Sequence, residues 1–128
     1  KGKGICIPWL VGSFYFNEGF DNTLHLMQDV LHDLCGIPEV APNLHPSVEV
    51  VLCQKEDTLL VQLVNGSGVF ANSYFEPIPM QNVTLRFPGL AGKQAHTLNG
   101  GTVTVQDDGT ALKLTLNRLE AYEAIVIS

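Results

Sequence analysis

The sequence predicts a mainly β fold, an antiparallel β-sandwich of about seven or eight strands preceded by a strand-loop-helix segment. Short apolar segments recur through residues 48–127, and turn sequences separate them about every eight to twelve residues. The clearest turns are Asn99-Gly100-Gly101 and Asp107-Asp108-Gly109, because Asn, Asp and Gly tolerate the positive φ of tight turns. One helical pattern near the N-terminus sets the first part of the chain apart.

The first elements are predicted to be a strand and a loop. The run over residues 4–9 is apolar on both faces, which is typical of a buried strand, and Pro8 should end it. Residues 12–20 are a predicted loop, rich in aromatic side chains.

A helix is predicted from Asn22 to Leu34, with Asp21 or Asn22 as its N-cap. Gly36 suits the left-handed position just past the helix, and Pro38 prevents continuation. Apolar residues recur at steps of three and four and form one stripe: Leu24, Met27, Val30, Leu31 and Leu34.

The main boundary is predicted at the proline-rich connector of residues 39–46, which follows directly after Pro38. Residues 1–38 would be a strand-loop-helix remnant of an α/β domain, and residues 39–128 a C-terminal β-sandwich domain. Residues 48–54 and 59–65 are predicted to form a hairpin around Lys55-Glu56-Asp57, and a long loop follows to about residue 81. Further strands are predicted at residues 83–87, 94–98, 102–106, 111–116 and 122–127.

Composition excludes two classes of partner. The net charge is −6, with 7 basic and 13 acidic residues and no basic cluster, so we expect no nucleic-acid binding. No apolar stretch approaches the roughly 20 residues that span a bilayer, so we expect no membrane contact. Cys6, Cys35 and Cys53 have apolar neighbours and are predicted to be buried free thiols, which favours a reducing compartment, the cytoplasm.

Several stretches, taken in their order along the chain, resemble the C-terminal end of bacterial glycoside hydrolases related to the family 42 β-galactosidases. Residues 3–9 with Gly12 and Tyr15 resemble a late strand and loop of the amidotransferase-like trimerisation domain of those proteins. The helix over residues 22–34 resembles the helix that ends that domain. The strand over residues 60–65, the loop over residues 74–79 and the closing strand over residues 120–127 resemble parts of their terminal β-sandwich.

The resemblance implies a piece of a larger enzyme without a catalytic centre, since the catalytic barrel of such hydrolases lies upstream. We therefore expect a non-catalytic accessory domain that supports domain packing and subunit association. The expected partners are the upstream domains of the parent chain and further copies in a homo-oligomer. No catalytic residue can be carried over from the family, and no cofactor is expected.

The helix carries the one candidate metal site. His25, Asp29 and His32 lie on one helical face opposite the apolar stripe, and two imidazoles with a carboxylate could hold zinc or another divalent ion. The competing interpretation is a solvated polar face, because a helix surface alone supplies no pocket around the ion.

Acidic residues supply no convincing catalytic pair. Glycoside hydrolysis needs two carboxylates on either side of the scissile bond, and nothing in the sequence brings two together. We expect each loose candidate to be a solvated surface residue: Glu39, Glu49, Glu76, Glu120 and Glu123.

Aromatic residues gather in two predicted loops. They could form a glycan platform in a carbohydrate-binding module, with Trp9, Tyr15 and Tyr74 as the candidate sugar contacts. The competing interpretation is that these side chains pack on each other or cover an oligomer interface, since aromatic residues dominate both kinds of core.

Overall fold

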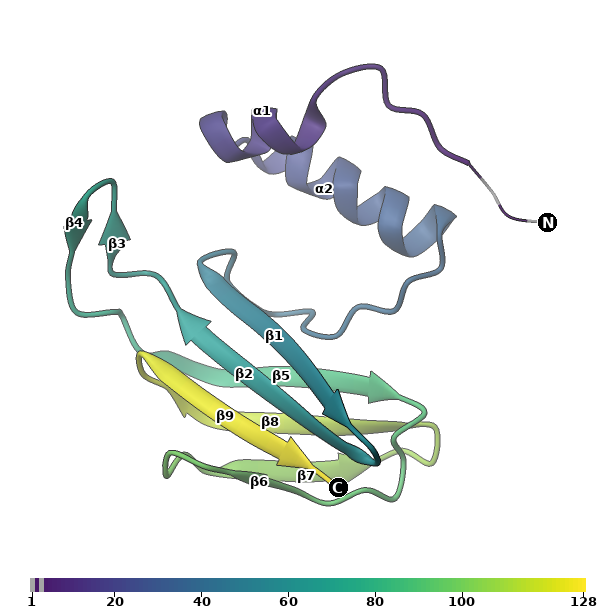
Figure 1. Cartoon of the computed structure of the whole chain (residues 1–128), viewed down its shortest axis with the longest axis vertical. Coiled ribbons are helices and arrows are strands. Elements are labelled where there is room, and N and C mark those ends of the chain that lie inside the picture. The colour runs from purple at the N-terminus through teal and green to yellow at the C-terminus, as the bar shows by residue number, and fades with distance from the viewer. Residues whose placement is uncertain (1, 3) are drawn as a thin grey trace. The chain divides into compact units, whose positions relative to one another are not determined.

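The computed structural model describes residue 2 and residues 4–128, which form two compact units. We call residues 1–39 the N-terminal unit and residues 40–128 the sandwich unit. This division lies one residue from the boundary that the sequence predicts. Figure 1 shows the helices of the first unit and the strands of the second.

The N-terminal unit contains two helices, α1 (Val11–Glu18) and α2 (Asp21–Asp29), and α2 continues as a π-helical turn over Val30–Leu34. The predicted helix over residues 22–34 is thereby confirmed. Gly36 takes a φ of 70°, and its N–H donates to the His32 carbonyl over 3.1 Å, which is the expected left-handed ending. The N-cap is Phe20, which makes no side-chain bond, so the predicted Asp21 or Asn22 cap is wrong.

Two further expectations for this unit are wrong. Residues 4–9 form no strand, because an isolated apolar run has no neighbouring strand in the described unit to satisfy its backbone groups. The predicted loop over residues 12–20 is instead mostly helix α1. Gly19 ends that helix with a φ of 66° while its N–H donates to the Tyr15 carbonyl over 2.8 Å.

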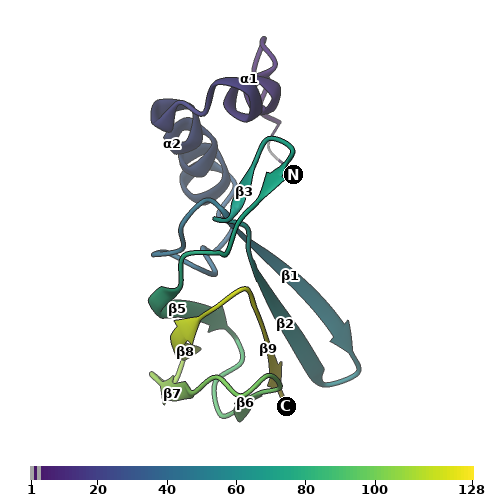
Figure 2. The same cartoon turned by 90° about the vertical axis from the view of Figure 1, so that its left-hand side faces the viewer.

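The sandwich unit holds the strands of two main sheets (Figure 2). One sheet has the order β1-β2-β9-β6 and the other β5-β8-β7, all pairs antiparallel. The strand bounds are β1 (Val48–Lys55), β2 (Thr58–Asn65), β5 (Met80–Pro88), β6 (Ala95–Thr97), β7 (Val103–Asp107), β8 (Ala111–Leu119) and β9 (Tyr122–Ile127). Each strand predicted from the sequence in this unit is present, which confirms the mainly β fold.

A small extra hairpin lies within the predicted loop of residues 66–81. It pairs β3 (Val69–Phe70) with β4 (Ser73–Tyr74). Gly68 precedes it where only a residue without a side chain fits, since a Cβ there would lie 2.1 Å from the Phe75 carbonyl oxygen.

The core lies between the two sheets. Strand β5 shows the predicted alternation, with Val83, Leu85 and Phe87 buried and Arg86 exposed. Buried residues of both sheets complete the core: Val61, Leu63, Ile125 and Ile127 on one side, and Leu112, Leu114 and Leu116 on the other. This single core holds the two sheets of residues 48–127 together.

The three cysteines are free and exposed, so the prediction of buried thiols is wrong. Cys53 alternates with core-side residues of β1 and shares its outward face with Glu49, while Cys6 lies outside any helix or strand. Apolar neighbours in the sequence therefore did not predict whether a cysteine is buried.

Candidate functional site

The predicted sugar contacts belong to different units. Trp9 is half-exposed in the N-terminal unit and packs edge-on against Phe14, with ring centroids 5.8 Å apart at 76°. Tyr15 is partly buried in α1, and Tyr74 is exposed on β4 of the sandwich unit. Within the N-terminal unit, Trp9 and Phe14 line a shallow hollow of about 320 Å³ together with polar residues of α1.

Both histidines of the predicted metal site contact groups outside that site. His25 faces Asp21, with Nε2 and Oδ2 separated by 3.8 Å, and the Nδ1–H of His32 donates to the Ile37 carbonyl over 2.7 Å. No group of three or more His, Cys, Asp or Glu side chains that could hold a metal ion occurs in the described part of the chain. His25, Asp29 and His32 therefore form no such group.

Four of the five candidate carboxylates are exposed as expected, namely Glu39, Glu49, Glu76 and Glu120. Glu123 is different: it is only 4% exposed, so its predicted place on the solvated surface is wrong. The reason is a turn that folds over it from the connection between β6 and β7.

Three backbone N–H groups donate to the Glu123 carboxylate. Oε1 accepts from Asn99 and from Ala124, each over 2.9 Å, and Oε2 accepts from Gly101 over 2.9 Å. A Cβ at Gly101 would lie 2.5 Å from Oε2, so glycine allows the chain to approach this closely. The buried charge is thus stabilised by the amides of the turn that it organises.

A polar hollow of about 300 Å³ opens beside this turn. Residues 99–102 form one wall, and the end of β8 with the start of β9 forms the other. Arg118 and Glu120 on that second wall make a half-exposed ion pair, with Nε and Oε1 2.5 Å apart. The sequence analysis did not predict this hollow. The one sequence signal for it is the Asn99-Gly100-Gly101 segment, which was interpreted only as a tight turn.

At the end of β2, the side chain of Asn65 bonds to three segments that link strands. Its Nδ2 donates to the carbonyls of Ile78 and Glu120, each over 2.9 Å, and its Oδ1 accepts from the Ser67 N–H over 3.1 Å. The side chain is 3% exposed. Asn65 is therefore a structural anchor, and its polar atoms are not free for a ligand.

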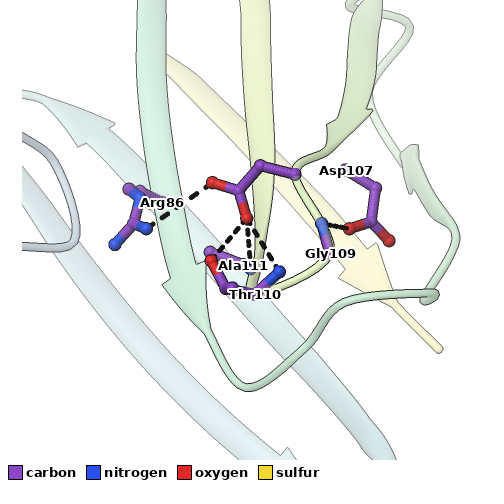
Figure 3. Close-up of polar contacts among 6 residues, drawn as sticks. Arg86, Asp107, Gly109, Thr110 and Ala111 are labelled. Atoms are coloured by element: carbon purple, nitrogen blue, oxygen red, sulfur yellow. Dashed lines mark hydrogen bonds and ion pairs between the residues drawn. The ribbon is translucent and has the colours of Figure 1, made fainter.

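Asp108 organises the turn between β7 and β8, and Figure 3 labels three of its partners, Arg86, Thr110 and Ala111. Its carboxylate accepts bonds from the Thr110 hydroxyl over 2.6 Å and from the N–H groups of Thr110 and Ala111 over 2.9 and 2.8 Å. These bonds, led by the Thr110 hydroxyl, with a smaller contribution from Arg86, lower the pKa of Asp108 from 3.8 to about 2.

This shift predicts how stability depends on acidity. A folded-state pKa below the unfolded value stabilises the fold above about pH 4, and the contribution is lost as pH falls through about 2. The Asp108→Asn variant should therefore be less stable than the wild type near neutral pH, and the difference should shrink between about pH 4 and pH 2.

Urea unfolding followed by circular dichroism at several pH values measures this difference. Asp57→Asn, in the turn between β1 and β2, controls for the loss of one exposed carboxylate. A gap between Asp108→Asn and wild type that stays constant down to about pH 2 would contradict the assignment.

The N-terminal unit exposes most of its apolar side chains. No hydrophobic residue in its described part is buried; Thr23 is its one buried side chain. Large hydrophobic residues are exposed throughout: Ile5, Trp9, Leu10, Phe14, Phe16, Phe20, Leu26, Leu31, Leu34 and Ile37. We call these ten residues the apolar surface of the N-terminal unit.

None of the helices in the described part of the chain has the length and hydropathy that crossing a bilayer requires.

Neither a protein-family model nor a curated protein sequence matches this chain. Among solved structures, the chain is similar to an alpha-L-fucosidase isoenzyme 2 from Paenibacillus thiaminolyticus, with a TM-score of 0.75 and 18% identity over 94% of this chain. The match covers 20% of the fucosidase chain, so this chain spans about one fifth of that protein's length. At this identity, the likeness shows a shared fold.

Proposed function

We propose that this chain is a non-catalytic accessory domain of a glycoside hydrolase, which supports domain packing and subunit association. The observation that carries the proposal is the apolar surface of the N-terminal unit. Helices of eight and nine residues are marginal in water, and most helical stability in proteins comes from packing an apolar face. A unit without a buried hydrophobic residue needs another surface to cover it.

Two likenesses support the proposed class of the parent enzyme. The sequence resembles the C-terminal end of hydrolases related to the family 42 β-galactosidases, and the fold is similar to a fifth of a fucosidase chain. We propose that the partners are the upstream domains of such a hydrolase and further copies of the same chain. We also propose a cytoplasmic location, because free thiols persist in a reducing compartment.

The carboxylates of the sandwich unit support a non-catalytic role. Glu120 and Glu123 both line the polar hollow, so they are the pair to consider there for glycoside hydrolysis. Both oxygens of Glu123 already accept backbone N–H bonds, and Arg118 pairs with Glu120. Glu123 is only 4% exposed and three backbone N–H groups hold its carboxylate, so a substrate could reach Glu120 alone. One accessible carboxylate does not make the pair that glycoside hydrolysis needs.

A second candidate function is sugar binding by the loop aromatics. Trp9 and Tyr74 are exposed, and flat aromatic faces can stack on sugar rings, which favours a carbohydrate-binding module. A sugar titration followed by ¹H–¹⁵N NMR tests this candidate, because binding at the loop aromatics would shift the signals of Trp9 and Tyr74.

The association proposal predicts an effect of Phe16→Ser. Phe16 is 86% exposed on α1, and burying a Phe side chain contributes about 1.5–3 kcal/mol. In sedimentation velocity, we expect the wild-type chain to form dimers or larger species as concentration rises. Phe16→Ser should weaken this association about tenfold or more.

Phe70→Ser is the matched control, since Phe70 is 76% exposed on β3 of the sandwich unit. It should associate like the wild type. A wild-type chain that stays monomeric at all concentrations, or a Phe16→Ser variant with an unchanged dissociation constant, would refute the association proposal. Equal weakening by both variants would refute its assignment to the N-terminal unit.

A further inference from the structure

The polar hollow of the sandwich unit has walls that its own hydrogen bonds fix in place. Glu123 holds the turn of residues 99–101 by two backbone N–H groups, those of Asn99 and Gly101, and the Thr97 hydroxyl donates to the Gly101 carbonyl over 2.5 Å. The backbone of Thr102 and Asn117 joins the two walls, with the Asn117 N–H donating to the Thr102 carbonyl over 2.9 Å. Such a preformed hollow can bind a ligand without ordering a loop.

Several polar groups on these walls remain available to a ligand. The Oδ1 of Asn117 accepts the Thr102 N–H over 3.1 Å, and no described residue accepts a bond from its Nδ2. Arg118 and Glu120 are half-exposed, and each keeps donors or acceptors beyond their mutual bond. Tyr122 is partly exposed, and its hydroxyl donates to Gln62 Oε1 over 3.0 Å, which fixes the ring at the edge of the hollow.

The charges of the hollow argue against an ionic ligand. Arg118 and Glu120 neutralise one another, and three backbone N–H groups already bond to the Glu123 carboxylate. A calcium ion would need six or more free oxygen ligands without a cation beside them, and Arg118 is such a cation. A phosphate or carboxylate ligand would meet the carboxylates of both Glu120 and Glu123.

We propose that this hollow binds a neutral sugar ring. Its hydroxyl groups would accept from Arg118 and Asn117 and donate to Glu120, and its apolar C–H face would lie against the ring of Tyr122. These residues differ from the loop aromatics Trp9 and Tyr74. The inference concerns the sandwich unit alone, so it does not depend on how the N-terminal unit associates.

The test is a titration of the whole chain with D-galactose, L-fucose and D-glucose, followed by ¹H–¹⁵N NMR. We expect at least one sugar to give saturable shifts at the amides of Gly100 and Gly101 and at the Arg118 side chain. The dissociation constant should be on the order of millimolar, as for a small ligand held by a few bonds in an open hollow. Glycerol serves as a polyol without a ring and should give no saturable shift at these groups.

Arg118→Gln should weaken sugar binding about tenfold, because glutamine cannot supply the charge-assisted N–H bond of the guanidinium group. Arg86→Gln is the matched control, since Arg86 is also half-exposed and paired with a carboxylate, Asp108, at 3.6 Å. It should bind sugar like the wild type. Glu120→Gln, also at an exposed position, provides a second variant and should weaken binding as well.

Four outcomes would overturn the inference. They are the absence of saturable shifts with all three sugars, equal shifts with glycerol, an unchanged affinity in Arg118→Gln, and shifts confined to Trp9 or Tyr74. The last outcome would support the loop aromatics as the sugar site instead. None of the four bears on the sedimentation result, so failure of this inference and failure of the association proposal are distinguishable.

Discussion

Replacing Glu123 by Ala should lower the free energy of unfolding of the sandwich unit by about 3–4 kcal/mol. The carboxylate accepts three backbone N–H bonds, at Asn99, Gly101 and Ala124, and the side chain is almost fully buried. Removing it leaves those donors unpaired, and each unpaired buried donor costs about 1–3 kcal/mol. Partial opening of the turn to water keeps the total below the sum of three full penalties.

Urea unfolding monitored by far-ultraviolet circular dichroism measures this loss. The single tryptophan, Trp9, lies in the N-terminal unit, so its fluorescence would report on the wrong part of the chain. Glu120→Ala is the matched control, because Glu120 is exposed, and it should change stability by less than about 0.5 kcal/mol. A loss below about 1 kcal/mol for Glu123→Ala would contradict the role of Glu123 as the anchor of the turn.

Replacing Asn65 by Ala should cost about 2–3 kcal/mol. Its amide group donates to the Ile78 and Glu120 carbonyls and accepts from the Ser67 N–H, so it joins the turn just after β2 to two segments farther along the chain. Alanine would leave these backbone groups without partners in a partly buried region.

Asn65→Asp sharpens the test, because it has nearly the same shape. It keeps an acceptor for the Ser67 N–H but turns a second oxygen toward two carbonyls, so it should be at least as destabilising as Asn65→Ala. Gln81→Ala, at an exposed position of β5, is the control and should have little effect. If Asn65→Asp were as stable as the wild type, the two donor bonds of Asn65 would be disproved.

The sandwich could be predicted because its signals are local. The alternation of Val83, Leu85 and Phe87 has the period of a strand with one buried face, and the structure buries these three residues. The stripe of the second helix and Gly36 past its end are equally local features. Each follows from the geometry of one element and needs no knowledge of the rest of the fold.

Other features depended on contacts between distant segments. An apolar run such as residues 4–9 becomes a strand only beside another strand, and its own sequence does not say whether one is present. Glu123 and Gly101 are distant in sequence, so neither one signals that a carboxylate lies under the turn. Cys53 has apolar neighbours, yet it faces outward because the period of the strand, and not its neighbours, sets its side.

Amide hydrogen exchange of α1 and α2 in the isolated chain tests most directly whether the N-terminal unit needs a covering surface. In dilute solution, the amides of both helices should exchange almost as fast as in an unfolded chain, while those of β2 and β8 stay protected. At high concentration, self-association should slow exchange in the helices alone. Helices already protected in dilute solution to the degree of the β-strands would contradict the account.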